Sequence, residues 1–363
     1  MNDRDISQQL QDAVRSAAAE GRALHIRGGG SKAFYGRDAD RAGEPLDLSG
    51  HRGIISYTAT ELVISARCGT PLAELEAALA ERDQVLPFEP PHFDADTSTT
   101  ATVGGALACG LSGPRRPWGG ALRDHVLGTR LLNGRGEPLR FGGEVIKNVA
   151  GYDVSRLLTG SLGVLGAVLE VSFKVLPAAA REVTLAQPCD AAEALRRAAR
   201  WSRQPLPLSG IAWDDGQLRL RLAGAAAGVT AAVAQLRAAD GGEEVDGNWW
   251  QALREQQLAF FAGEAPLWRL SLPPASAPLD QLPGDWLLDW GGAQRWLRSE
   301  APAESIRAAA AALGGHATLF RGGERSGEVF HPLDPVKARL HRSIKAAFDP
   351  KGIFNPGKLY ADL

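Results

Sequence analysis

The chain has 363 residues, a length at which two domains, or one domain with a large insertion, are expected rather than one core. Apolar residues make up 44% and charged residues 23%, and the formal net charge of −2 gives no indication of nucleic acid or an anionic membrane as partner. No apolar run approaches the roughly 20 residues of a membrane span, and the N-terminus lacks a signal peptide's apolar stretch. The sequence therefore predicts a cytoplasmic chain.

The three cysteines, Cys68, Cys109 and Cys189, are scattered and form no CxxC pair. Neither a zinc site nor a cysteine-ligated iron–sulfur cluster can be assembled from this chain alone. We expect no metal, and any iron–sulfur chemistry would have to come from another chain.

Before Pro177 the sequence predicts helices and strands separated by glycine-rich loops. The predicted elements are a helix over 5–19, a strand at 24–26, a strand at 62–66, a helix capped by Thr70 and ending near Arg82, a strand at 126–133, a helix over 151–159 and a long strand over 164–176. This part holds most of the glycine clusters and only one of the nine tryptophans, Trp118.

After Pro177 the pattern changes, and the other eight tryptophans lie between Trp201 and Trp296. Asp214-Asp215-Gly216 between two apolar runs predicts a β-hairpin. Helices are predicted over 190–203, 225–238, 248–261 and 303–313, with strands near 267–272, 285–290 and 316–320 and a last helix after Asp334. This order favours an α+β fold in which an antiparallel sheet carries helices on one face. We find no fixed-period repeat.

The first glycine loop follows the strand at 24–26 and has the sequence Arg27-Gly28-Gly29-Gly30-Ser31-Lys32. Consecutive glycine N–H groups can form an anion-binding nest, and Arg27 and Lys32 add positive charge. The loop matches neither the G-x-G-x-x-G fingerprint nor a P-loop. By itself it is as consistent with a plain turn as with a phosphate site.

Two further glycine segments favour an extended ligand. Pro90 precedes Thr99-Thr100-Ala101-Thr102-Val103-Gly104-Gly105, which continues to Ser112 and Gly113 and on to Arg115 and Arg116. A third cluster combines 147–153 with Gly160-Ser161-Leu162-Gly163-Val164-Leu165-Gly166. Three separate glycine sites before one long strand suggest a dinucleotide rather than a single phosphate; a long ordered surface loop is the alternative.

The order of these motifs resembles FAD-binding domains of the vanillyl-alcohol-oxidase type, also called PCMH-type. The resemblance rests on 27–31, 101–105, 123–128, 160–166 and the C-terminal Phe348-Asp349-Pro350 with Asn355-Pro356-Gly357-Lys358. It implies a two-lobed FAD-binding domain over 1–177, an antiparallel-sheet cap domain over 178–330 and a C-terminal segment, 331–363, that returns to the FAD-binding domain.

Two stretches narrow the resemblance. Lys147-Asn148-Val149-Ala150-Gly151-Tyr152-Asp153 and the segment Asp289 to Trp296 are similar to the family of E subunits of bacterial glycolate oxidases. That family implies one flavoprotein subunit of a complex that oxidises glycolate, a 2-hydroxy acid, to glyoxylate. The implied partners are a larger FAD-containing subunit and an iron–sulfur subunit. Peripheral association with the inner membrane through the complex stays open.

By position, the resemblance implies a set of FAD contacts in the glycine loops and the C-terminal segment. They are Arg27, Gly28, Gly29, Gly30, Ser31, Lys32, Pro90, Thr102, Val103, Gly104, Gly105, Ser112, Gly113, Arg123, Asp124, Gly160, Gly163, Val164, Val168, Asn355 and Lys358. Family members that bind flavin covalently through the first loop use a histidine there, and Ser31 follows the glycines here. We therefore expect non-covalent FAD.

The residues that would carry substrate chemistry are less evident. Related 2-hydroxy-acid dehydrogenases have an H-x-G-D-G-N-x-H motif, which is absent here. The nearest stretch offers His316 as a base and Arg321 as a carboxylate clamp, but a strand histidine and a surface arginine are the simpler interpretation. Three hypotheses remain: an FAD subunit that oxidises the hydroxy acid, an FAD-binding relay or structural subunit, and a stand-alone flavin oxidoreductase of another small hydroxy acid.

Overall fold

The structure is a computed structural model that describes residues 3–38, 43–94, 99–143 and 153–363. The chain forms two compact units. Unit 1 contains residues 1–111, 121–177 and 325–363, and unit 2 contains residues 112–120 and 178–324. Compared with the domain limits expected from the sequence, residues 112–120 belong with unit 2 and residues 325–330 with unit 1. All nine tryptophans consequently belong to unit 2.

One lobe of unit 1 consists of a helix and two short parallel strands. Helix α1 (Ser7–Glu20) buries Leu10, Val14 and Ala17, as its helical spacing predicts, and ends at a left-handed Gly21. Strands β1 (Leu24–Arg27) and β2 (Glu44–Asp47) pair in parallel. The first glycine loop therefore begins where β1 ends.

The second lobe of unit 1 is a five-stranded sheet in the order β3-β4-β8-β6-β7. Its strands are β3 (Ile54–Thr58), β4 (Val63–Arg67), β6 (Val126–Leu132), β7 (Pro138–Gly142) and β8 (Ala167–Lys174). Every second residue of β8 is buried, so one face of this strand lines the core.

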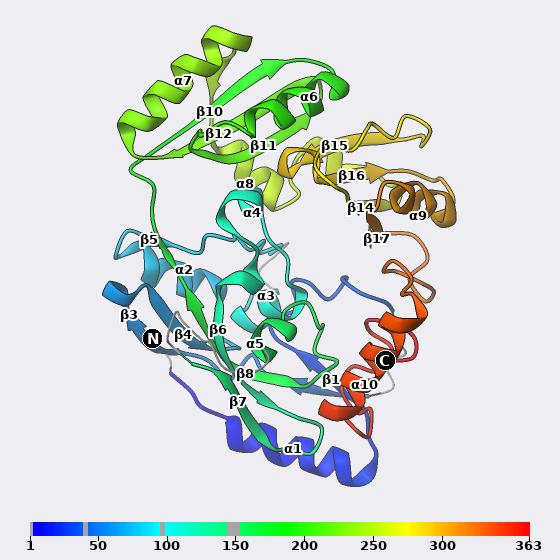
Figure 1. The fold of residues 1–363 in the computed structure, drawn as a ribbon. Coiled ribbons are helices and arrows are strands. Elements are labelled where there is room, and N and C mark those ends of the chain that lie inside the picture. Colours follow the sequence, from blue (N-terminus) through cyan, green and yellow to red (C-terminus); the bar gives the residue numbers. More distant parts are fainter. Residues whose placement is uncertain (1–2, 39–42, 95–98, 144–152) are drawn as a thin grey trace. The chain divides into compact units, whose positions relative to one another are not determined.

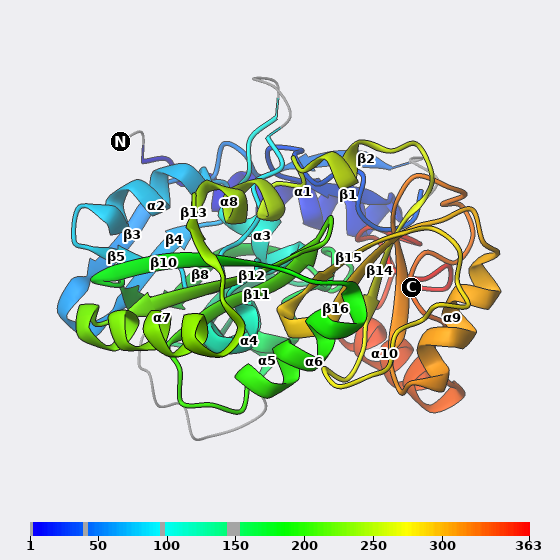
Figure 2. The ribbon, with the colours of Figure 1, turned by 90° about the horizontal axis from the view of Figure 1, so that it is seen from above.

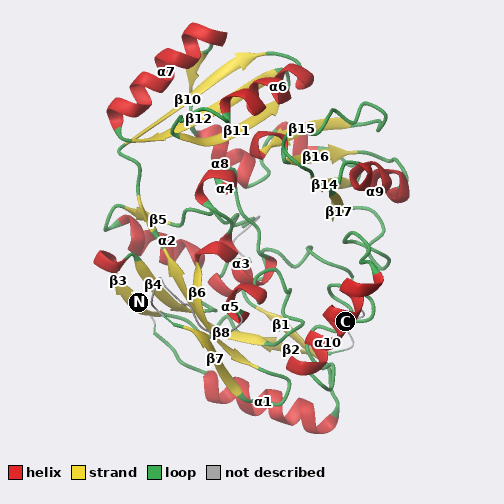
Figure 3. Ribbon diagram, in the orientation of Figure 1, coloured by secondary structure: helices red, strands yellow, loops and turns green. Residues whose placement is uncertain are grey.

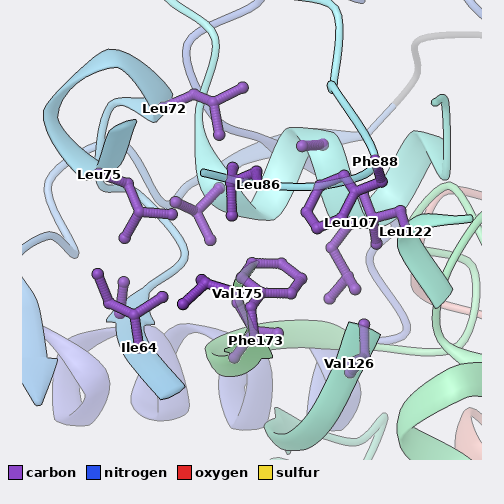
Figure 4. Close-up of a cluster of buried hydrophobic side chains, with 14 of the residues drawn as sticks. Ile64, Leu72, Leu75, Leu86, Phe88, Leu107, Leu122, Val126, Phe173 and Val175 are labelled. Atoms are coloured by element: carbon purple, nitrogen blue, oxygen red, sulfur yellow. The ribbon is translucent and has the colours of Figure 1, made fainter. Parts of the chain in front are cut away.

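Helices α2 (Leu72–Ala80) and α3 (Val103–Cys109) pack on this sheet and close a single apolar cluster. Figure 4 shows Leu72, Leu75 and Leu107 on one side of the cluster and Ile64 and Phe173 on the other. The core therefore fixes α3, the helix that begins within the second glycine segment.

The remaining elements of unit 1 are short, except for one helix. They are β5 (Gln84–Val85), β9 (Leu176–Pro177), α5 (Val154–Leu157), α10 (Pro335–Phe348) and the 3-10 turns η1 (Ala59–Glu61) and η2 (Leu122–His125).

Three sequence expectations for local structure need correction. Thr70 does not cap α2: the N-cap residue is Pro71, and the Thr70 hydroxyl bonds the backbone of Gly53 instead. The strand expected over 164–176 begins only at Ala167, because Gly163 and Gly166 have positive φ angles. The helix expected over 248–261 ends at Arg254.

Unit 2 contains an eight-stranded antiparallel sheet in the order β13-β10-β12-β11-β15-β16-β14-β17 (Figure 3). Its strands are β10 (Arg181–Pro188), β11 (Leu208–Asp214), β12 (Gln217–Gly224), β13 (Glu243–Val245), β14 (Leu267–Ser271), β15 (Asp285–Asp289), β16 (Gln294–Arg298) and β17 (His316–Arg321). Its helical elements are α4 (Arg116–Gly119), α6 (Ala191–Trp201), α7 (Ala226–Asp240), α8 (Asn248–Arg254), α9 (Ala303–Ala312), η3 (Ala259–Ala262) and η4 (Trp290–Gly292).

The sheet of unit 2 is two copies of one topology. In the first half, strands β10, β11, β12 and β13 are ordered β13-β10-β12-β11, and in the second half β14, β15, β16 and β17 are ordered β17-β14-β16-β15. Both orders are 4-1-3-2, the split βαββαβ arrangement. The halves meet through one residue pair, Trp213 with Leu288. This duplication has no counterpart as a sequence period, so the sequence did not predict it.

The two halves differ in one crossover. In the first half α6 connects β10 to β11, and α7, which lies beside β10 and β12, connects β12 to β13 (Figure 2). In the second half α9 corresponds to α7, but residues 272–284 connect β14 to β15 without a helix. The helix that should match α6 is absent.

None of the helices in the described ranges combines the length and apolar character needed to cross a membrane.

Candidate functional site

The first two glycine segments are in direct contact. Thr100 donates its backbone N–H to the Gly29 carbonyl (2.9 Å), and Gly30 and Thr100 form a parallel bridge. A Cβ on Gly29 would lie 1.9 Å from the Thr100 carbonyl oxygen, and one on Gly28 would lie 2.5 Å from Thr102 Oγ1. Only glycine permits this approach of the two segments.

The first loop offers backbone donors. Within the described part of the chain, the N–H groups of Gly28, Gly29 and Gly30 donate to no protein acceptor. Lys32 is buried, with Nζ 3.1 Å from the His92 carbonyl oxygen and 3.3 Å from Ser31 Oγ, and the exposed Arg27 lies 3.7 Å from Asp47. Adjacent N–H donors beside a buried cation suit an anionic group such as a diphosphate.

The second segment is fixed to the core. Thr102 Oγ1 accepts the N–H of Gly105 (3.1 Å) and caps α3, and Gly104 donates to the Cys68 carbonyl (2.8 Å). A Cβ on Gly104 would lie 2.7 Å from the Cβ of Cys68. Burial raises the pKa of the Cys68 thiol, so Cys68 packs here as a neutral side chain.

The third segment lies against the other end of α3. Gly160 donates to the Leu107 carbonyl (3.0 Å) and Leu162 to the Ala108 carbonyl (2.9 Å). Gly160 has a φ of +80°, and the nearest atom to a Cβ there would be 4.0 Å away, so its backbone faces open space. Val164 is part of a core cluster and Val168 packs against it, so any ligand contact by this segment would be mainly through its backbone.

Asn355 ties the first segment to the third. Its Oδ1 accepts the N–H of Ile26 (2.8 Å) in β1, and its Nδ2 donates to the Leu162 carbonyl (2.6 Å). Lys358 Nζ lies 3.3 Å from the Ala33 carbonyl oxygen and 3.2 Å from that of Arg37. Both side chains therefore bind backbone groups of the glycine region.

Two threonine hydroxyls lie in or beside the glycine segments but were not among the expected FAD contacts: Thr99 begins the second segment, and Thr159 precedes Gly160. Thr99 Oγ1 and Thr159 Oγ1 are buried, and neither has a hydrogen-bond partner among the described residues. A buried hydroxyl without a partner is costly, so these two hydroxyls, one in the second segment and one beside the third, are available to a bound ligand. The glycine cradle and these hydroxyls together fit an extended, phosphate-bearing group.

The remaining expected FAD contacts differ in burial, in their contacts and in the unit to which they belong. Pro90 is buried, the Arg123 side chain is exposed and Asp124 accepts the N–H of Ala121 (2.9 Å). Ser112 and Gly113 belong to unit 2, where Trp290 Nε1 donates to the Gly113 carbonyl (3.0 Å). Residues 147–152 lie outside the described residues, and Asp153 caps α5.

His316 and Arg321 are not brought together. They lie at opposite ends of β17, where their partners on β14 are Ser271 and Leu267. The two residues are five positions apart along β17, which corresponds to a separation of about 16 Å in a regular strand. Arg321 donates to Gln256 Oε1 (2.9 Å), and His316 is exposed. The described residues also contain no group of three metal-ligating side chains.

Comparison with protein families defines the class. Residues 6–142 match the family model described as FAD binding domain, and residues 293–359 match the model described as FAD linked oxidases, C-terminal domain. The protein is a flavoprotein of the FAD-linked oxidoreductase class, and both predictions, of the fold and of FAD, are confirmed.

Comparison with individual proteins defines the family. The chain is 50% identical over 359 residues to the glycolate oxidase subunit GlcE of Escherichia coli (strain K12), covering 99% of both chains. It therefore belongs to the GlcE family of glycolate oxidase subunits, as the sequence predicted. It is 25% identical over 414 aligned positions to a D-lactate dehydrogenase of Archaeoglobus fulgidus, covering 98% of this chain and 90% of that protein.

Two further comparisons are with a relative that matches only part of this chain and with a solved structure of low sequence identity. The chain is 38% identical over 98 residues to the glycolate oxidase subunit GlcD of Bacillus subtilis, covering 27% of this chain and 20% of that protein. A solved structure of alkyldihydroxyacetonephosphate synthase has a TM-score of 0.67 at 14% identity, covering 98% of this chain and 75% of that one. At that identity the likeness supports the fold alone.

Proposed function

We propose that the chain is the FAD-binding subunit of a glycolate-oxidising complex, in which electrons from oxidation of glycolate to glyoxylate pass through its FAD to an iron–sulfur subunit. The observation that carries the proposal is the convergence of three glycine segments, with two threonine hydroxyls that have no partner among the described residues, in a chain 50% identical to a glycolate oxidase subunit. A larger flavoprotein subunit is the second proposed partner.

The proposed FAD contacts begin with the diphosphate. The N–H groups of Gly28 to Gly30 would hold it, with Lys32 and Arg27 supplying positive charge. Thr102, Val103, Gly104 and Gly105 would line its other side, and the backbones of Gly160 and Gly163 would continue along the cofactor. Asn355 and Lys358 would act by holding the loops in place.

FAD, when bound, supplies a carrier that accepts a hydride and can release electrons one at a time. No histidine lies in the first loop, so we propose that the chain holds FAD non-covalently. Acid precipitation tests this: the yellow colour should appear in the supernatant. Colour that stays with the polypeptide would contradict non-covalent binding.

A second candidate function is an electron relay without substrate chemistry of its own. The separation of His316 from Arg321 favours it, because a base and a carboxylate clamp for one small hydroxy acid must lie within a few ångström of that substrate. The larger subunit would then oxidise glycolate.

Anaerobic reduction by glycolate separates the two candidates. The FAD-loaded chain is mixed with glycolate alone and then with both partner subunits, and flavin absorbance is followed. Bleaching of the isolated chain supports oxidation at this subunit. Bleaching that requires the partners supports the relay. A purified chain that contains no FAD and takes up none would contradict both.

A further inference from the structure

The crossover between β14 and β15 leaves a cavity in unit 2. By comparison with the first half, a helix equivalent to α6 would connect β14 to β15. Residues 272–284 lie there instead and fill only part of the volume that such a helix would occupy. A cavity of about 590 Å³ remains, lined by Pro278 and Leu279 of this crossover, by Leu195 of α6 and by Leu288 of β15. Its position at the junction of the two halves follows from the missing helix.

The walls of this cavity, here called the crossover groove, are apolar and aromatic. Trp213 and Leu288, the residue pair that joins the half-sheets, line it together with Trp286 and Phe260. Trp286 is only half-buried, and the Trp213 indole donates to the Cys189 carbonyl (2.8 Å). Partly exposed tryptophans around a concave apolar surface are typical of protein interfaces.

Four carboxylates, Asp214, Asp215, Asp280 and Asp285, also line the groove. Asp214 is half-buried, and burial raises its pKa, whereas the nearby Arg219 opposes that shift. Two arginines line it as well, but their guanidiniums are held by backbone carbonyls: Arg295 by those of Gly292, Ala277 and Ser276, and Arg298 by those of Phe260, Phe261 and Ala265. The lining therefore has four carboxylates and two guanidiniums, a formal charge of −2, and its carboxylates form what we call the carboxylate rim.

We propose that the crossover groove is a docking site for a basic, amphipathic helical segment of another subunit of the complex, whose apolar side chains fill the space that residues 272–284 leave uncovered. Three observations support this occupant: the helix position that the first half fills with α6, the apolar lining, and the carboxylate rim, which favours lysine or arginine on the incoming segment. The inference rests on the proposed function, since it requires a complex.

The test fills the groove with a side chain. Ala191, the first residue of α6, lines the groove and is half-buried, whereas Ala226 is the first residue of α7 and is exposed. The variants A191W and A226W therefore add the same side chain at matched helix positions, one inside the groove and one outside. The chain is co-expressed with its partner subunits, and partner recovery, FAD content and melting temperature are measured.

A191W should lower partner recovery at least tenfold at unchanged FAD content and melting temperature, and A226W should have no effect. A second experiment reverses charge. The double variant D280K/D285K should lower the recovery of partner subunits and make that recovery less dependent on salt concentration. The control variant E243K, on the exposed edge strand β13, should change neither quantity. If A191W misfolds, the charge-reversal variants still test whether the groove binds a partner.

Each other outcome overturns the inference. Wild-type partner recovery in A191W and in the charge-reversed variant would show that the groove is not the docking site, while leaving the proposed function intact. Loss of a homodimer with the heteromer preserved would assign the groove to a second copy of this chain. A wild-type chain that recovers no partner would overturn both the complex and the docking site.

Discussion

At the residue scale, Gly29 sets the closest approach between the two segments proposed to hold the FAD diphosphate. G29A should lower FAD affinity at least tenfold, because its Cβ would lie 1.9 Å from the Thr100 carbonyl and force the segments apart. Fluorescence titration with FAD measures this. The control is G228A in the exposed start of α7, where nothing lies within 4 Å; alanine there should stabilise the protein by up to about 1 kcal/mol. Equal FAD affinity in both variants would contradict the assignment of the loop.

Thr159 allows a test that removes a polar group instead of adding an atom. Its hydroxyl has no hydrogen-bond partner among the described residues. T159V keeps the shape and removes a buried unpaired group, so the FAD-free protein should be as stable as the wild type or more stable, by about 1 kcal/mol. FAD affinity should fall by a factor of about 2 to 12, the value of one hydrogen bond. Denaturant unfolding measures the free energy of unfolding, and titration with FAD measures the affinity. T230V, at an exposed position in unit 2, should leave FAD affinity unchanged, and a destabilised T159V with normal affinity would assign the hydroxyl a structural role.

Clustered glycines made the three segments visible in the sequence, because the ability to approach a neighbouring backbone belongs to the residue itself. Thr99 and Thr159 were not among the expected FAD contacts, because a missing hydrogen-bond partner appears only in three dimensions. Asn355 was expected among the FAD contacts, and its amide is bonded to the backbones of Ile26 and Leu162, 329 and 193 positions away in sequence. No local pattern encodes contacts at that separation.

At the element scale, a buried ion pair holds the end of α10. Lys345 Nζ lies 2.7 Å from Asp349 Oδ2 and also donates to the carbonyls of Val164 (2.7 Å) and Phe354 (2.8 Å). Burial lowers the pKa of Lys345, and the Asp349 carboxylate opposes that shift. The pair thereby joins α10 to the third glycine segment and to the strand-like segment that precedes Asn355.

K345M should lower the free energy of unfolding by about 3 to 5 kcal/mol, because Asp349 would stay buried without its cation. Urea unfolding measures the change, and K337M on the exposed start of α10 should cost less than about 1 kcal/mol. Adding D349N to K345M should restore part of the loss, since the amide carries no charge. A cost below 1 kcal/mol for K345M would mean that the pair contributes little.

Most long elements follow from the sequence because their apolar spacing is strong: α1, α7, α9 and α10 lie within a few residues of the expected ranges. Strands and irregular segments depend more on their neighbours than long amphipathic helices do. β10 was not predicted, although it pairs with both β12 and β13, and the helix expected to reach residue 261 ends at Arg254 and is followed by a separate 3-10 turn. The topological duplication of unit 2 could not be predicted, since strand order is not written in residue periodicity.

At the scale of the whole molecule, the tryptophans give a selective probe, because all nine belong to unit 2 whereas most proposed FAD contacts belong to unit 1. FAD at 100 times its dissociation constant should stabilise the state that binds it by about 2.7 kcal/mol. The melting transition followed by far-ultraviolet circular dichroism should therefore rise more than the transition followed by tryptophan fluorescence. An equal rise in both would show that the two units unfold as one cooperative body.

The way the chain passes between its units also sets an order of assembly during synthesis on the ribosome. Unit 2 has all its residues once Glu324 has emerged, whereas unit 1 still lacks residues 325–363, and with them Asn355, Lys358 and the Lys345–Asp349 pair. Unit 1 begins first and is completed last. Domains tend to fold as they emerge, so the glycine loops would remain without their C-terminal support while unit 2 folds. Stable capture of the cofactor then becomes a late, post-translational step, and nascent chains stalled before residue 325 are the species most exposed to aggregation.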